Sequence, residues 1–352
     1  MKHSRLSTTP LRPHALLLLG MAAFLAVPAR ADINSDLAFT AFAGTAVDVN
    51  ALANGTILQA RGPIMTFSRG ITSQSLFVID AAPVDVAARL AHWNPARHPV
   101  LKVWLHKPLP PNPVPADFAD LASLPDNSSV QFQIDSTAKL NPGSPSLQVS
   151  KEEAQLIAST AAQEKNPKEL FAKAWGQVLT GRLNNFFSGR AASDYDLSSE
   201  GQVHPLSDVK SLLHSDLKVY GQYQRLLNQT PVKALAGGNA ARLNPASVYC
   251  EVFDVEGFAA VSTGAMYQAA NGNAIQSADI EFYANYGVYA TIELEQIWPI
   301  IANGKNETLV WREDLVSAPN IAYLHGTERL ASSMVMLQET KDGVQAFKDE
   351  FK

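Results

Sequence analysis

The sequence has one cysteine and few charged residues. Cys250 is the only thiol among 352 residues, so no disulfide can form within the chain. Charged residues make up 17% of the chain, the formal net charge is −5, and no basic cluster occurs. Such a mildly acidic chain is a poor match for nucleic acid or an anionic membrane surface. We therefore expect a hydrophobic core to hold the fold together, and no nucleic-acid partner.

The motifs of common catalytic and cofactor-binding families are also missing. The chain contains no G-x-S-x-G, H-E-x-x-H, C-x-x-C, Walker loop or G-x-G-x-x-G. His92, His98 and His106 lie close together, but their spacings of six and eight residues do not match a zinc-ligand pair. Cys250 lies in an apolar run, which favours a buried, inert thiol. We expect no metal and no cofactor, and a non-enzymatic role is favoured.

Two groups of polar residues keep catalytic alternatives open. Asp194 and Asp196 precede His204 in a polar loop, where a carboxylate and an imidazole could act in a hydrolase. Carboxylates also alternate along the predicted sheet, at Glu281, Glu293 and Glu295. Two facing carboxylates could form a glycosidase-like pair, but a solvated sheet face is the simpler interpretation.

The first 31 residues have the pattern of a secretory signal peptide. Basic residues precede an apolar stretch from Ala15 to Val27, and Ala29-Arg30-Ala31 matches a cleavage signal. The stretch is too short for a membrane span of about 20 residues, and no long apolar run follows. We expect cleavage near Ala31 and a periplasmic or secreted protein without a membrane span.

Three regions follow the signal peptide, and residues 32–352 can also form one compact domain. Residues 32–146 predict an N-terminal α+β region, with a helix opened by Pro83 and a short strand at 130–134. Residues 147–246 form a helical segment, which begins with the capping box of Ser150 and Glu153. Residues 247–352 predict a β-meander and a C-terminal helix.

The third region has the clearest periodicity. Asn271-Gly272 and Asn303-Gly304 each lie between apolar runs, which predicts type I′ hairpins. Even positions from Ile280 to Leu294 are apolar or small and most odd positions are polar, as in a half-buried strand. Strands are predicted at about 247–255, 258–269, 274–286, 288–300 and 307–316, with breaks at Gly257 and Gly287 or, alternatively, a continuous strand through Gly287. The final helix should bury one stripe of residues: Leu330, Met334, Leu337, Val344, Phe347 and Phe351.

The predicted fold class is therefore α+β, an antiparallel meander of about five strands packed on a long C-terminal helix, with an inserted helical segment. The sheet is rich in aromatic residues, which occur both in binding surfaces and in ordinary cross-strand packing. Arg312 would be the natural contact for an anion. The candidate ligand-binding residues are Tyr249, Tyr267, Phe282, Tyr286, Trp298 and Arg312.

Phe77 to Trp93, together with the sheet and helix from Ser247 to Lys352, resembles the helix-grip (START-like) superfamily. The resemblance implies that the sheet grips the long helix and that lipids or other apolar ligands lie between them. The leading hypothesis is a protein that binds an apolar or amphipathic small molecule between sheet and helix. The alternatives are a cell-envelope structural or interaction protein, with an exposed apolar patch on the Phe171 to Phe187 helix, and a hydrolase using His204 with Asp194 or Asp196.

Overall fold

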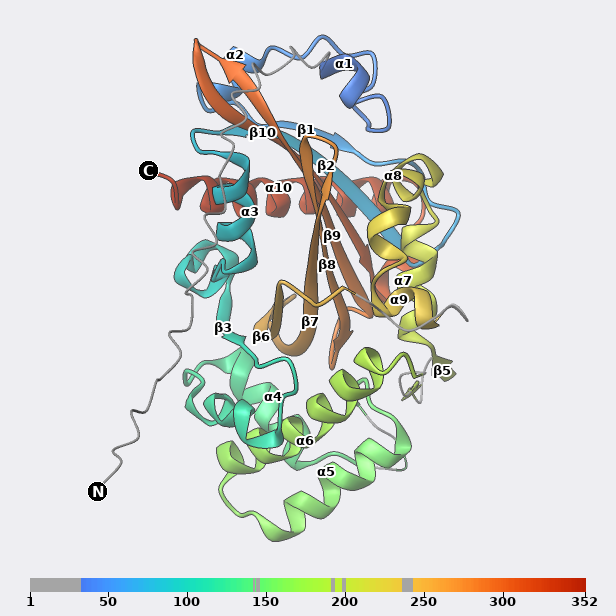
Figure 1. Cartoon of the computed structure of the whole chain (residues 1–352). Coiled ribbons are helices and arrows are strands. Elements are labelled where there is room, and N and C mark those ends of the chain that lie inside the picture. The colour runs from blue at the N-terminus through green and yellow to red at the C-terminus, as the bar shows by residue number, and fades with distance from the viewer. Residues whose placement is uncertain (1–32, 142, 144–145, 191–193, 198–200, 236–242) are drawn as a thin grey trace, which may run out of the picture.

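The computed structural model describes residues 33–352, except 142, 144–145, 191–193, 198–200 and 236–242. The predicted signal peptide thus lies outside the described residues. One large antiparallel sheet organises the described part of the chain (Figure 1), with the strand order β1-β2-β10-β9-β8-β7-β6-β3. Its strands are β1 (Leu58–Arg61), β2 (Gly70–Ile79), β3 (Val103–Pro108), β6 (Ser247–Val255), β7 (Phe258–Asn271), β8 (Ala274–Ala284), β9 (Ala290–Ala302) and β10 (Lys305–Ser317).

Strands β6 to β10 are consecutive neighbours, which confirms the predicted five-stranded meander. The N-terminal region adds β2 beside β10, with β1 outside it, and β3 beside β6. The full sheet therefore has eight strands and joins both ends of the chain. A separate two-stranded ladder joins β4 (Tyr195–Leu197) and β5 (Gly201–Val203).

Positive φ angles mark the tight turns of the meander. Asn303 and Gly304 have φ of 49° and 75°, as a type I′ turn requires. The first predicted turn differs, because the loop between β7 and β8 is Gly272-Asn273 and only Gly272 has positive φ. Gly287 has φ of 76° and lies between β8 and β9, so the break predicted there is confirmed and a continuous strand is wrong.

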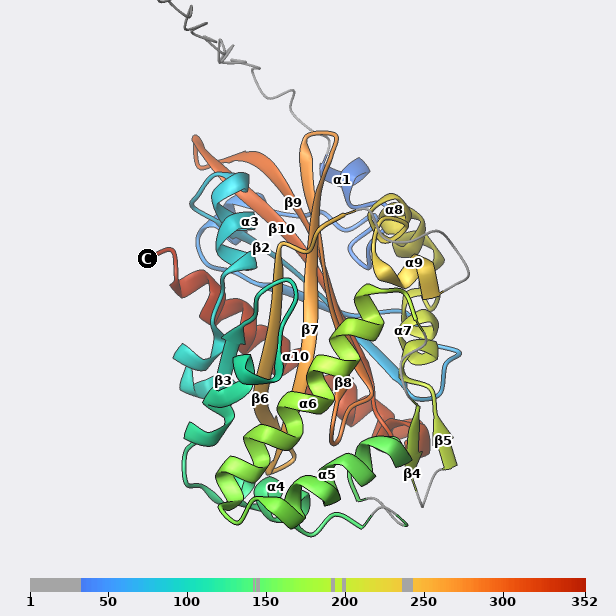
Figure 2. The same cartoon turned by 60° about the horizontal axis from the view of Figure 1, so that its bottom comes forward.

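Helices cover both faces of the sheet. On one face lie α3 (Pro83–Ala91) and α10 (Gly326–Asp349), which pass behind or beside the strands in Figures 1 and 2. The other described α-helices lie on the side of the opposite face: α1 (Ile33–Asp36), α2 (Val49–Ala53), α4 (Ser128–Ala138), α5 (Lys151–Gln163), α6 (Pro167–Phe187), α7 (Pro205–Leu213), α8 (Leu217–Leu227) and α9 (Pro231–Leu235). Short 3₁₀ turns complete the connections: η1 (Pro95–Arg97), η2 (Pro99–Leu101), η3 (Pro115–Ser123) and η4 (Asn320–Tyr323). Among the described helices, none is long and apolar enough to cross a membrane.

One local prediction is wrong, and the stripe predicted for the final helix is correct for Val344 and Phe347 but not for Leu330 and Met334. The strand expected at 130–134 is part of α4, because the Asn127 side chain caps the helix by accepting from the Val130 amide at 2.9 Å. In α10 the buried side is centred on Thr340, Val344 and Phe347. At 3.6 residues per turn, Leu330 and Met334 are rotated by roughly a quarter turn around the helix axis from Thr340 and Val344, respectively. Leu330 and Met334 are 43% and 57% exposed.

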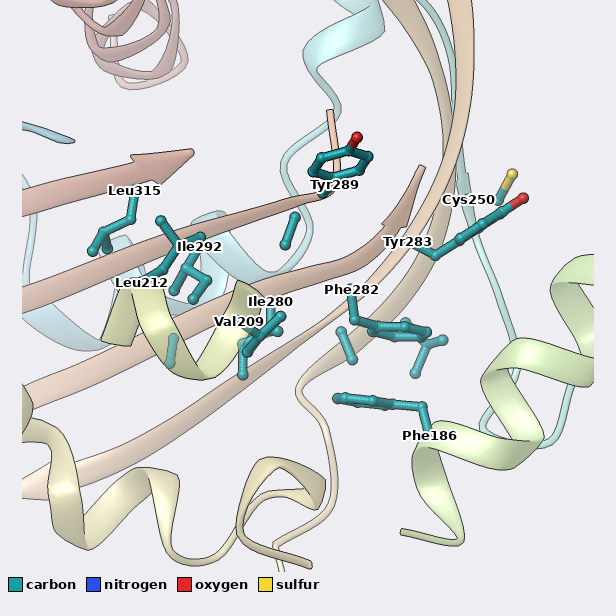
Figure 3. Close-up of a cluster of buried hydrophobic side chains, with 14 of the residues drawn as sticks. Phe186, Val209, Leu212, Cys250, Ile280, Phe282, Tyr283, Tyr289, Ile292 and Leu315 are labelled. Atoms are coloured by element: carbon teal, nitrogen blue, oxygen red, sulfur yellow. The ribbon is translucent and has the colours of Figure 1, made fainter. Parts of the chain in front are cut away.

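The larger core lies between the inserted helices and the face of the sheet that carries the even positions from Ile280 to Leu294. We call this the even face and the opposite one the odd face. Figure 3 shows Phe186 of α6 stacked on Phe282 of β8, with ring centroids 3.9 Å apart. Cys250 is buried in the same core, and burial raises the pKa of its thiol, as expected for an inert cysteine. The smaller core joins Phe77, Val310 and Ile297 to α3 and α10. Both faces of the sheet are thus covered, and the expectation of a solvated odd face is wrong.

Candidate functional site

A pocket of about 260 Å³ lies between the odd face of the sheet and helices α3 and α10. Nine apolar residues line it, from helices, turns and strands: Leu90, Ala91, Trp93, Pro95, Leu101, Val103, Phe253, Met266 and Gly343. The nine polar lining residues all lie on strands: His106, Ser247, Tyr249, Glu251, Asp279, Glu281, Thr291, Glu293 and Arg312. Small-molecule sites likewise combine apolar surface with polar groups.

The register of the strands brings carboxylates together on this face. Asp279 of β8 lies directly opposite Glu293 of β9, which in turn lies opposite Asp314 of β10. Glu295 lies opposite Arg312 in the next row. Like charges in direct cross-strand positions destabilise a sheet unless cations or protons neutralise them.

Arg312 neutralises one end of this row. Its Nε donates to both carboxylate oxygens of Asp314 at 2.9 and 3.1 Å, and Nη2 lies 2.7 Å from Glu293 Oε1. Nη1 is 3.9 Å from Glu295 Oε1. The guanidinium is buried and surrounded by carboxylates of its own chain, so the anion-contact role suggested for it would have to compete with them.

Tyr249 connects the other end of the pocket. Its hydroxyl donates to Asp279 Oδ1 at 3.0 Å, and its ring stacks with His106 at a centroid distance of 5.3 Å. A Cβ at Gly264 would lie 2.4 Å from the Tyr249 hydroxyl, so only glycine lets the ring cross strand β7 here. His106 Nδ1 lies 2.6 Å from Glu251 Oε1.

Glu281 is the least satisfied carboxyl of the pocket. Its Oε2 accepts from the Ser262 hydroxyl at 2.9 Å, while Oε1 is buried and has no hydrogen-bond partner. The residue is 8% exposed. Because a buried polar atom without a partner costs free energy, a hydrogen-bond donor at Oε1 would stabilise the folded protein.

Burial changes the protonation of the whole group. Burial and the neighbouring Glu293 raise the pKa of Asp279 to about 7. Burial also raises the pKa of Glu293 and of Glu295 to about 8, against the opposing effect of Arg312. The pKa of Glu281 is raised well above its usual value by burial and by Glu251. At neutral pH several of these carboxyls therefore hold protons that an incoming cation could replace.

The structure brings together two of the six predicted ligand-binding residues. Tyr249 and Arg312 line the pocket. Tyr267, Phe282 and Trp298 lie in the larger core on the opposite face, and Tyr286 packs at its margin against Phe132 and Phe258. The prediction treated Glu281 and Glu293 only as part of a carboxylate pair or a solvated face, and Asp279 and Trp93 were not among its candidate residues. Alternating carboxylates on adjacent strands were a signal, but the sequence did not show that helices cover them.

The hydrolase pair meets outside this pocket. His204 Nδ1 lies 2.7 Å from Asp194 Oδ2, and the side chain of His204 is 55% exposed. The side chain of Asp196 lies outside the described residues. Neither His204 nor Asp194 lines the pocket, so the pair lacks the apolar surroundings found there.

Searches of protein-family models, curated proteins and solved structures found no match to this chain. The likeness to the helix-grip superfamily therefore remains a prediction. Among the described residues, no group of three or more His, Cys, Asp or Glu side chains could hold a metal ion. The site is thus interpreted from its own residues.

Proposed function

We propose that this chain is a non-catalytic protein that binds a small amphipathic molecule in the pocket between the sheet and helices α3 and α10. One observation carries the proposal: apolar side chains and Glu281, whose buried Oε1 has no hydrogen-bond partner, line the same pocket. The apolar side chains would cover the apolar part of the ligand, and the strands would contact its polar group. The volume is slightly below the range of about 300–1,000 Å³ usual for drug-sized ligands, so we expect a compact molecule.

Gly343 offers a direct way to fill the pocket. It lines the pocket from α10, and a Cβ there would meet no heavy atom within 4 Å. A leucine at this position would occupy the space of the ligand. It should also raise helix stability, because glycine inside a helix costs roughly 0.5–1 kcal/mol. We therefore expect Gly343→Leu to fold at least as well as the wild type and to lose the bound molecule.

Native mass spectrometry of protein purified from its own cells measures this loss. The matched control is Gly221→Leu, since Gly221 lies in α8, is exposed and also has open space around a Cβ. We expect an adduct on the wild type and on Gly221→Leu, and none on Gly343→Leu. Equal adducts on all three proteins, or no adduct on any, would contradict binding in this pocket.

We further propose that the protein acts outside the cytoplasm after removal of residues 1–31. The support is the sequence pattern of a basic start, an apolar stretch and Ala29-Arg30-Ala31. Intact mass and N-terminal sequencing of the native protein should then give a chain that begins at Asp32. A chain isolated from cells that retains Met1 or Lys2 would contradict export by this signal.

The alternative, a structural or interaction protein, is supported by another surface than the one predicted on α6. Phe171, Trp175 and Phe186 of α6 are buried, so the exposed patch suggested there is wrong. Exposed apolar side chains instead lie on α10, at Leu330, Met334 and Val335. This alternative requires no small molecule, so the comparison of Gly343→Leu with Gly221→Leu also separates it from the binding function.

A further inference from the structure

The charges around the pocket are unevenly balanced. Arg312 and His106 are the basic side chains that line it, and both lie against carboxylates of the chain. Asp279 and Glu281 have hydroxyl donors only: Tyr249 for the first and Ser262 for the second. In the described part of the chain, no Lys, Arg or His side chain forms an ion pair with either of them.

From this arrangement we propose that the ligand is an organic cation, a compact amine whose ammonium group lies against Asp279 and Glu281. The proposal rests on the proposed function and names the class of molecule that the pocket binds. Glu281 points to a donor in particular, because it lines the pocket and its buried Oε1 has no hydrogen-bond partner. An N–H donor there would complete its hydrogen bonding, and charge-assisted hydrogen bonds are roughly twice as strong as neutral ones.

The apolar lining of the pocket favours an organic cation over a metal ion. Trp93, Phe253 and Tyr249 bring three aromatic rings to the pocket, and an ammonium group is attracted to the faces of such rings. A metal ion has no apolar surface that could pack against Leu90 and Met266. The described residues also contain no carboxylate or histidine group arranged for a metal.

The same carboxyls predict that protons leave the site when the amine binds. An ammonium ion favours the ionised forms of Asp279 and Glu281, whose pKa values burial raises. The other charged or titratable groups on this face come from the strands: His106, Tyr249, Glu251, Glu293, Glu295, Arg312 and Asp314. Helices α3 and α10 contribute Leu90, Ala91 and Gly343, which do not titrate.

Three probes of nearly equal size test the charge: 2-phenylethylamine, 2-phenylethanol and phenylacetate. Isothermal titration calorimetry of the mature protein at pH 7.5, in phosphate and in Tris, measures both affinity and proton release. We expect the amine to bind about tenfold more tightly than the alcohol, the carboxylate to bind more weakly than both, and the amine to release protons.

Glu281→Gln should bring the affinities for the amine and the alcohol together, chiefly by weakening the binding of the amine. The matched control is Glu307→Gln, a buried carboxyl of the same sheet that does not line the pocket and should keep the preference for the amine. Circular dichroism checks that both variants are folded. Asp279→Asn gives a second variant if Glu281→Gln unfolds.

Two results would overturn the cationic class: tightest binding of the carboxylate, or an unchanged amine preference in both pocket variants. If the probes bind to the wild type but not to Gly343→Leu, the proposed binding function stands whichever of these two results is found. If no probe binds to the wild type, the cationic class fails, and the adduct comparison for Gly343→Leu decides separately about the binding function.

Discussion

Replacing Arg312 by methionine is expected to lower the free energy of unfolding by about 3–5 kcal/mol at pH 8. Methionine preserves much of the apolar stem but removes the guanidinium that lies between Asp314, Glu293 and Glu295. The three carboxyls would then share a buried site without a cation, where ionised neighbours repel one another. Urea denaturation at pH 8 measures the loss.

The dependence on pH separates this explanation from a simple packing defect. At pH 5 Glu293 and Glu295 hold their protons, since burial raises both pKa values to about 8, so the same substitution should cost clearly less. Arg89→Met is the control, because Arg89 is half exposed and pairs with Glu350 at the surface, where a pair contributes about 0–1 kcal/mol. A loss for Arg312→Met that is equal at both pH values would contradict the electrostatic account.

The wild-type protein should become less stable as the pH rises from 5 to 8. The folded pKa is about 7 for Asp279 and about 8 for Glu293, Glu295 and Glu313, whereas the unfolded values lie near those of ordinary carboxyls. The folded state therefore binds more protons than the unfolded state over this interval. The stability that these protonated carboxyls contribute is complete below their unfolded pKa values. It is lost as the pH rises through their folded pKa values. We expect a decrease of about 3 kcal/mol or more between pH 5 and pH 8.

Urea midpoints measured at half-unit pH intervals give the slope of this decrease. Glu295→Gln should make the slope shallower, because it removes one carboxyl that is 1% exposed and accepts no described hydrogen bond. Gln at exposed Glu328 of α10 is the matched control and should leave the slope unchanged. Stability that rises with pH in the wild type would show that these carboxyls are stabilised in their ionised form.

The local rules of strand and turn chemistry were sufficient to predict the meander. Asn303-Gly304 adopts the two positive φ angles that the pair suggested, and Gly287 lies in the loop between β8 and β9, where a break was predicted. The alternation between Ile280 and Leu294 correctly placed the even side chains in a core. These features depend on neighbours in sequence, which is why a single sequence is enough to predict them.

The candidate site depended on contacts between distant segments. Strand β2 joins β10 from the other end of the chain, and α3 with α10 covers the odd face of the sheet. Periodicity distinguishes the two faces of a strand but does not show what packs on each, so the carboxylates looked solvated. Aromatic side chains such as Phe282 and Trp298 were chosen for the site although they pack into the larger core. The charged residues on the other face of the sheet indicated the position of the pocket better than the aromatic ones did.

The central claim is that the pocket under α3 and α10 binds an organic amine, and a crystal structure of the protein with 2-phenylethylamine tests it most directly. The account predicts density in the pocket, with the nitrogen within hydrogen-bond distance of Glu281 Oε1 and the ring against Trp93 and Phe253. A pocket closed by side chains, or one that holds only water at a saturating probe concentration, would contradict it.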